Sequence, residues 1–167
     1  MKALLNTAVD LCLLRLGPQH LPASPILLLV CLLLNLLVGV LMVTEVNMGL
    51  AEALAESLFE IAFMLVALYL ALRIYKKLPR FNQAATALML SGLLLGLFSL
   101  PLVSWNQRSQ SVLSGMLLLL LIFWSIVVMG HILRHTFNIP LNVGIAVGVF
   151  YTLLSLNLTI LLFPVTI

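Results

Sequence analysis

Long apolar runs separated by short polar segments fill most of the chain. The hydrocarbon core of a membrane is about 30 Å thick, so a helix needs roughly 20 apolar residues to cross it. Five runs have about this length, and we predict a spanning helix for each, at residues 25–43, 55–74, 84–103, 112–132 and 139–163. Strands are not expected, because lipid leaves an open sheet edge unpaired and no alternating barrel segments are present. The pattern therefore predicts an all-α, polytopic membrane protein, built as a bundle of five transmembrane helices.

The first residues follow a different pattern. Lys2, Asn6 and Asp10 recur every four residues and so share one face of a helix, whereas the leucines of this stretch fall on other faces. A glycine and three prolines then end this helix before the first span. We predict that residues 1–24 form an amphipathic interfacial helix with a Pro/Gly linker, ahead of one transmembrane domain at 25–167. The alternative is a first turn that packs under the bundle.

Composition supports the membrane class. Of the 167 residues, 63% are hydrophobic and 8% are charged, whereas about a quarter of the residues of a soluble domain are charged. The connections between the predicted spans are short, so they leave no room for a separate soluble domain. We therefore expect one compact bundle.

The basic residues predict the orientation of this bundle. Seven of the eight Lys and Arg residues fall on one side of the predicted spans. By the positive-inside rule, the N-terminus is then cytoplasmic, the C-terminus is external or periplasmic, and the segment 44–52 is external. A cytoplasmic collar results, which consists of Arg73, Lys76, Lys77, Arg80, His131, Arg134 and His135. Anionic lipid headgroups are its expected partner, and the net charge of +3 requires no nucleic acid.

Three carboxylates lead into the second span. Glu52, Glu56 and Glu60 are four residues apart and share one helix face, with Glu60 the deepest of them. A charged group in hydrocarbon costs free energy unless it finds a partner, a proton or a route to water. Glu60 is therefore a structural hydrogen-bonding group between helices, a proton, cation or ligand site, or a side chain that reaches the outer surface. Candidate donors to it are Asn35, Arg108, Tyr151, Thr152 and Asn157.

Two pairs of glycines concern helix packing. Gly92 and Gly96 lie four residues apart in the third span, and Gly144 and Gly148 do so in the fifth. Because the hydrophobic effect does not drive helices together in lipid, close approach over small residues is a main source of association. We expect close helix contacts at these positions. The partner helix belongs to the same chain, to a second copy in a homo-oligomer, or to another membrane protein.

Signatures of metal binding and of catalysis are weak or missing. His131 and His135 are one turn apart and need a third ligand to hold a metal, and no such ligand is evident. Cys12 and Cys31 have no partner at metal-ligand spacing. No nucleophile turn, phosphate loop or His-Glu-x-x-His motif occurs. We expect no enzymatic activity, no bound metal and no cofactor.

Several segments are similar to a known family. They are "RFNQAATALMLSGLLLGLFSLP" at the start of the third span, "IFWSIVVMGHILRH" at the end of the fourth, and "FYTLLSLNL" in the fifth. With five spans and a short link between the second and third, they resemble the Yip family of Rab-interacting membrane proteins, over roughly residues 26–163. The chain lacks the polar N-terminal region and the Asp-Leu-Tyr-Gly-Pro motif of eukaryotic members, so GTPase binding is not implied. The resemblance implies a small inner-membrane protein of bacteria with a scaffolding or membrane-organising role.

Two classes of function follow. The first is a non-enzymatic scaffold, accessory subunit or membrane-organising factor. The second is a small carrier or channel component that uses Glu60 as an intramembrane proton, cation or ligand site. The first is favoured, because Glu60, Asn35 and Asn157 are too few to line a polar route across the bilayer.

Overall fold

The computed structural model describes residues 2–44 and 49–163, and every regular element in this part of the chain is helical. Five helices are long and apolar enough to cross a membrane, and they are α2 (Pro25–Thr44), α3 (Leu50–Ile74), α4 (Phe81–Ser109), α5 (Val112–Phe137) and α6 (Leu141–Leu162). The helix α1 (Lys2–Cys12) precedes them, and two 3-10 turns, η1 (Pro18–His20) and η2 (Leu78–Arg80), lie in the linkers. The predicted all-α fold with five spanning helices is confirmed.

Three helices are several residues longer than the apolar runs that predicted them. α3 begins at Leu50 and so includes Glu52, α4 continues through Pro101 to its end at Ser109, and α5 ends at Phe137. A helix requires satisfied backbone hydrogen bonds and not apolar side chains, so polar residues extend it beyond the apolar run. Residues 45–48 of the predicted external segment, and residues 164–167 at the C-terminus, lie outside the described part of the chain.

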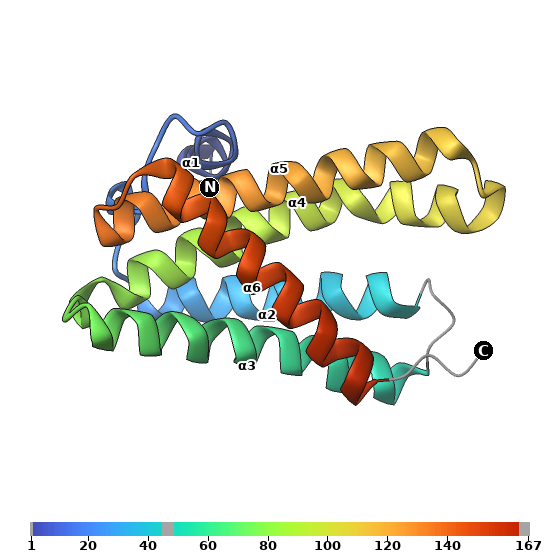
Figure 1. The fold of residues 1–167 in the computed structure, drawn as a ribbon, viewed down its shortest axis with the longest axis horizontal. Helices are drawn as coiled ribbons and strands as arrows, with labels where there is room; N and C mark the ends of the chain where they lie inside the picture. The colour runs from blue at the N-terminus through green and yellow to red at the C-terminus, as the bar shows by residue number, and fades with distance from the viewer. Residues whose placement is uncertain (1, 45–48, 164–167) are drawn as a thin grey trace.

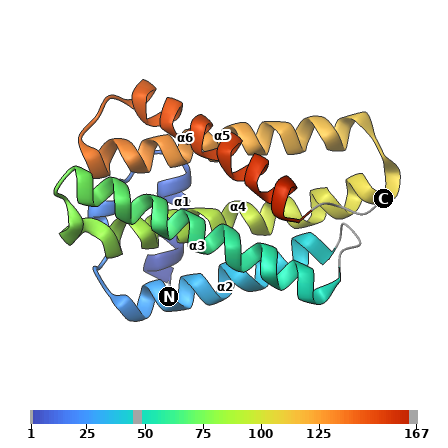
Figure 2. The ribbon, with the colours of Figure 1, turned by 60° about the horizontal axis from the view of Figure 1, so that its bottom comes forward.

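The helices α2 to α5 run lengthwise along the bundle, and α1 lies across them (Figure 1, Figure 2). α2 packs against α3 and α4, α4 packs against α5, and α5 packs against α6. From its contact with α5, α6 runs diagonally across the bundle toward the far end of α3 (Figure 1). The rings of Phe63 and Tyr151, with centroids 5.4 Å apart, join α3 to α6 on this path.

Glycine backbones meet where α6 crosses α5. A Cβ atom added to Gly144 would overlap the carbonyl oxygen of Gly130 and lie 3.1 Å from its carbonyl carbon. One added to Gly148 would lie 3.3 Å from the carbonyl oxygen of Ile126. Gly144 and Gly148 therefore pack within the chain against α5. The sequence pattern did not point to Gly130, which belongs to neither glycine pair.

The other glycine pair faces α2. A Cβ atom on Gly92 would lie 3.3 Å from the side-chain oxygen of Asn35, and one on Gly96 would lie 3.0 Å from a methyl carbon of Val38. These distances are at or below ordinary van der Waals contact, so larger residues would push α4 away from α2. Both pairs thus support helix contacts inside one copy of the protein.

Helix α1 packs against the bundle through one face. Ala8, Leu11 and Cys12 are buried, while Leu5 and Val9 are exposed. The indole nitrogen of Trp124 donates a hydrogen bond to the carbonyl oxygen of Cys12 at 3.1 Å. Trp124 lies 13 residues before Phe137, the last residue of α5, which is about 20 Å along the helix. The end of α1 is therefore held beside the middle of α5.

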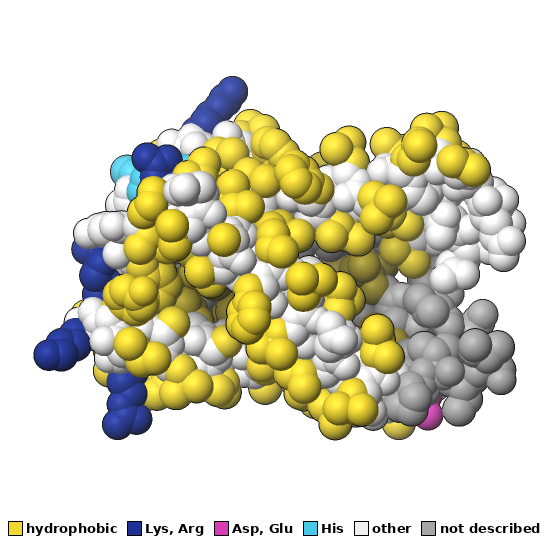
Figure 3. All heavy atoms as spheres, viewed as in Figure 1, with side chains coloured by type: hydrophobic (Ala, Val, Ile, Leu, Met, Phe, Trp, Pro, Cys, Tyr) yellow, Lys and Arg dark blue, Asp and Glu magenta, His cyan; other side chains and the backbone are white. Residues whose placement is uncertain are grey.

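Lys and Arg side chains gather at one end of the bundle, which we call the basic end, whereas Glu lies toward the other (Figure 3). The carbonyl oxygens at the C-terminus of α5 accept hydrogen bonds here, at 2.7 Å from Lys77 to Phe137 and at 3.2 Å from Arg80 to Thr136. These cations complement the negative end of the helix dipole and its free carbonyl groups. The predicted collar residues thus lie together. That the basic end faces the cytoplasm stays a prediction.

Candidate intramembrane binding site

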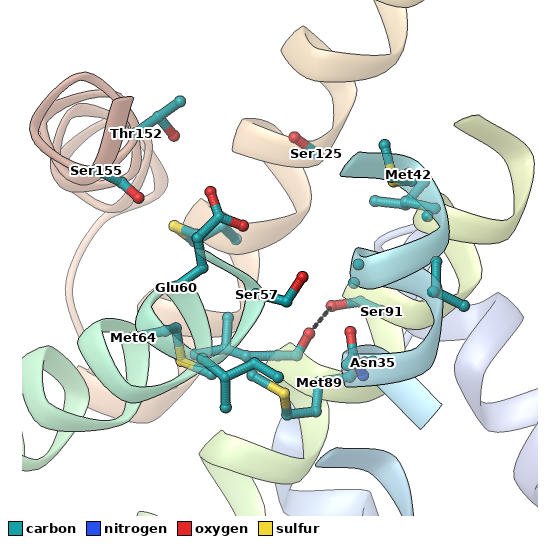
Figure 4. A pocket seen from close by; sticks show the side chains of 18 of the residues that line it. Asn35, Met42, Ser57, Glu60, Met64, Met89, Ser91, Ser125, Thr152 and Ser155 are labelled. Carbon is teal, nitrogen blue, oxygen red and sulfur yellow. Dashed lines mark hydrogen bonds between the residues drawn. The ribbon is translucent and has the colours of Figure 1, made fainter. Parts of the chain in front are cut away.

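A cavity of about 370 Å³ lies between the spanning helices, and all five of them contribute to its wall. We call it the Glu60 cavity. Its polar lining residues are Asn35, Ser57, Glu60, Ser91, Ser125, Tyr151, Thr152 and Ser155 (Figure 4). In the space-filling view the surface is hollowed between α6 and the hairpin of α4 and α5 (Figure 3). Four of the polar candidates from the sequence therefore meet at one site, namely Asn35, Glu60, Tyr151 and Thr152.

The Glu60 side chain points into this cavity and stays exposed to it (Figure 4). It lies 10 residues from Leu50 and 14 from Ile74, or about 15 Å and 21 Å from the two ends of α3. One of the roles that the sequence left open is a structural hydrogen bond between helices. No residue in the described part of the chain donates such a bond to the Glu60 carboxylate. The cavity separates Glu60 from the facing helices.

Ser57 stands one turn before Glu60 on the same helix and also lines the cavity. Its hydroxyl oxygen is buried and has no hydrogen-bond partner among the described residues. Gly39 of α2 faces it, and a Cβ atom there would lie 2.9 Å from the hydroxyl. Leaving a buried hydroxyl unpaired costs about 1–3 kcal/mol, a cost that a ligand with a hydrogen-bonding group removes.

Asn35 joins α2 to α4 and leaves one polar atom free. Its amide nitrogen donates to the carbonyl oxygens of Cys31, at 2.8 Å, and of Met89, at 2.7 Å. Both amide protons are used in these bonds, so Asn35 has none left for Glu60. Its side-chain oxygen lies beside Gly92 and is an acceptor that faces the same cavity.

The wall from α6 combines an aromatic ring with hydroxyl groups. Tyr151 stacks on Phe63, and Phe63 in turn stacks on Phe59 with ring centroids 5.9 Å apart. The Thr152 hydroxyl donates to the carbonyl oxygen of Gly148 at 2.9 Å, so its proton is bound within α6. From the sequence, Tyr151 and Thr152 were predicted only as possible hydrogen-bond donors to Glu60.

Other predicted candidates lie elsewhere. Asn157 is exposed, does not line the cavity, and donates to the carbonyl oxygen of Leu153 at 2.7 Å. Arg108 is exposed near the end of α4 and is not part of the wall. Glu56 is half-buried outside the cavity, although it is close enough to Glu60 for the two carboxylates to interact electrostatically. Asn157 and Arg108 were therefore wrongly considered as donors to Glu60.

The sequence analysis missed four serines and four methionines of the cavity. The methionines are Met42, Met64, Met89 and Met129. Methionine side chains are flexible and polarizable, so they adapt to apolar ligands of different shape. A signal was available for part of this set, because Ser57 and Glu60 are three residues apart and Tyr151 and Ser155 are four apart, spacings that share a helix face.

The histidines and cysteines do not form a metal centre in the part of the chain that the structure describes. No three or more His, Cys, Asp or Glu residues gather there. The rings of His131 and His135 lie 4.6 Å apart, and Nε2 of His131 is 3.0 Å from the carbonyl oxygen of Leu16. Cys12 is a buried free thiol in α1, and burial raises its pKa to about 11.

Comparisons of the chain with family models, with curated proteins and with solved structures found no match. The resemblance to the Yip family therefore stays a prediction from the segments quoted above.

Proposed function

We propose that this protein binds a small organic cation in the Glu60 cavity and acts as a carrier or as a component of one. The observation that supports this function is an unpaired carboxylate that points into a cavity lined by all five spanning helices. Ionisable groups inside a membrane protein generally mark a path for a substrate or an ion. In this cavity the Glu60 carboxylate would bind the cation on its path through the bundle.

The charges and polar atoms of the cavity favour a cation. None of the described residues in its wall is Lys, Arg or His, so the Glu60 carboxylate is the charged group that a ligand meets. The free side-chain oxygen of Asn35 is a further acceptor. A ligand that carries an ammonium group forms a charge-assisted hydrogen bond with a carboxylate, which is roughly twice as strong as a neutral one. An anion finds no comparable donor.

The rest of the wall favours an organic ligand over a metal ion. Hard metal ions require several oxygen or nitrogen ligands, and the cavity supplies one carboxylate and no imidazole. Methionine side chains and the ring of Tyr151 instead provide apolar and aromatic surface, which attracts alkylated cations. The volume of about 370 Å³ lies in the range of small-molecule sites.

Because of this cavity we propose the second of the two functions that the sequence suggested in place of the first. We favoured a scaffold because too few polar residues were available to line a route. The structure adds Ser57, Ser91, Ser125 and Ser155 to the same wall as Glu60. A Yip-like scaffold gives no reason for an open polar cavity at this depth, whereas a carrier needs one.

Uptake into proteoliposomes tests this proposal. Tetraethylammonium crosses lipid slowly, so protein-dependent uptake of the labelled ion reports transport. We expect uptake with the wild-type protein, and loss of it in Glu60→Gln at unchanged thermal stability, because the amide keeps the shape but not the charge. Glu52→Gln is the matched control, since Glu52 is exposed in the first turn of the same helix. Equal uptake by Glu60→Gln and wild type, or a destabilised Glu60→Gln, would support the structural role instead.

A further inference from the structure

A second cavity, of about 300 Å³, lies at the basic end of the bundle, away from Glu60. Its wall is formed by η1, the end of η2, the start of α4 and the end of α5 with the residue that follows it. Its polar side chains come from Gln19, Arg80, Gln83, His135 and Asn138, together with the hydroxyl of Thr136. None of the described residues in this wall is Asp or Glu. The cavity is therefore polar and carries positive charge without a compensating carboxylate.

The guanidinium group of Arg80 is held in place at this cavity. One of its terminal nitrogens donates to the carbonyl oxygens of Thr136, at 3.2 Å, and of His135, at 3.4 Å. Arginine has five N–H groups, so the other terminal nitrogen and Nε keep donors that no described residue accepts. A fixed guanidinium with free donors is suited to two parallel hydrogen bonds with an oxyanion.

His135 and Gln83 add further donors. The His135 ring is half-buried beside His131, and its nitrogens have no hydrogen-bond partner in the described residues. Gln83 donates one amide proton to the carbonyl oxygen of Leu21 at 3.2 Å, which fixes its side chain and leaves its second amide proton. Donors from α4 and α5 thus converge on one cavity.

Charges around the cavity increase its attraction for anions. Arg80 lies in the wall, and Arg134 lies close enough to His135 to interact with it electrostatically, so two guanidinium groups supply the positive charge here. Among the described residues the carboxylates lie elsewhere, because Asp10 pairs with Arg15 at 3.9 Å and the three glutamates of α3 lie away from its basic end. Positive charge that no carboxylate neutralises attracts an anion from solution or from a membrane surface.

We propose that this cavity binds a phosphate group. The planar guanidinium matches phosphate oxygens in two-point contact, and imidazole and amide groups complete the set of donors. The group belongs to an anionic lipid headgroup or to a soluble phosphate compound, since both offer the same oxygens. This site is separate from the Glu60 cavity and does not depend on the carrier function.

Binding measurements on the full chain in detergent test the site and identify the source. The probes are inorganic phosphate and dihexanoyl phosphatidic acid, with dihexanoyl phosphatidylcholine as a zwitterionic control lipid, and binding is followed by thermal stability across a concentration series. We expect saturable binding to wild type that is weakened by about tenfold or more in Arg80→Gln and His135→Phe. Binding of the lipid alone identifies a headgroup site, and binding of inorganic phosphate alone identifies a soluble ligand.

The matched control is Arg73→Gln, which removes an equal charge from the last turn of α3 without changing the cavity wall. It should bind like wild type. Arg80→Gln also removes the hydrogen bonds of Arg80 to the end of α5, so this variant is expected to be less stable. If it does not fold, phosphate binding by His135→Phe decides the question, because the phenyl ring keeps the contact with His131. Wild-type affinity in His135→Phe, an equal loss in Arg73→Gln, or no saturable binding of either phosphate probe would overturn the proposal.

Discussion

Gly144→Ala is the sharpest test of how the bundle is assembled. The added methyl group would overlap the carbonyl oxygen of Gly130 and lie 3.1 Å from its carbonyl carbon. Both atoms belong to the backbone and cannot rotate away, so α6 must move off α5. Overpacking of this kind costs about 1–3 kcal/mol, whereas replacing a glycine inside a helix by alanine gains about 0.5–1 kcal/mol. We therefore expect a net loss of about 1–2 kcal/mol.

Thermal unfolding in detergent measures this loss. For a protein of this size, 1 kcal/mol changes Tm by about 2–4 °C, so Gly144→Ala should melt roughly 2–8 °C lower than wild type. Gly115→Ala is the matched control in α5, because its nearest neighbour, the side-chain oxygen of Asn106, is 3.9 Å from the new Cβ atom. It should melt at or slightly above wild type. An equal or higher Tm for Gly144→Ala would refute the close contact between Gly144 and Gly130.

Two further predictions concern access to the chain. Burial raises the pKa of the Cys12 thiol to about 11, so little thiolate is present at neutral pH and its reaction with a maleimide should be slow. As the pH is raised toward the pKa, the rate should increase about tenfold for each pH unit. Equal rates at neutral and alkaline pH would contradict this. For orientation, a cysteine placed at Ser109 should react with an impermeant reagent from outside the cell and one at Lys76 should not, and the reverse pattern would overturn the topology.

The spans could be predicted because hydropathy is a local property of the sequence. A helix must present apolar residues to lipid along its whole length, so runs of that length mark it directly. The ends were less accurate, since α3 begins five residues before the predicted run and so includes Glu52. Hydropathy reports the lipid boundary and not the last backbone hydrogen bond.

The site could be predicted only in part, because it depends on how the helices are rotated about their axes. Glu60 was found because a carboxylate in an apolar run is conspicuous. Asn157 was grouped with it wrongly, since it is two residues after Ser155 and therefore lies on nearly the opposite face of α6 from the cavity. A single serine in an apolar helix does not indicate a site. The four serines could be assigned to one only because the packing of five helices brings them to the same cavity.

The contact of Gly130 with Gly144 could not be predicted from the sequence either. It has no glycine four residues away, so the pattern that identified Gly144 does not identify its partner. Which backbone a small residue meets depends on the crossing of two helices that the sequence does not specify. The structure was needed to join the two positions.

Equilibrium binding of tetraphenylphosphonium to the purified protein tests the central claim most directly. Its delocalised charge and phenyl rings match a carboxylate surrounded by Met and Tyr151 side chains. We expect saturable binding to wild type and to Glu52→Gln, and an affinity lower by about tenfold to a hundredfold in Glu60→Gln. The amide removes the Coulomb attraction between the two unit charges, which is roughly 1–4 kcal/mol at about 4 Å between the dielectric of water and that of a protein surface. Binding to Glu60→Gln with wild-type affinity, or no saturable binding to wild type, would contradict a cation site at Glu60.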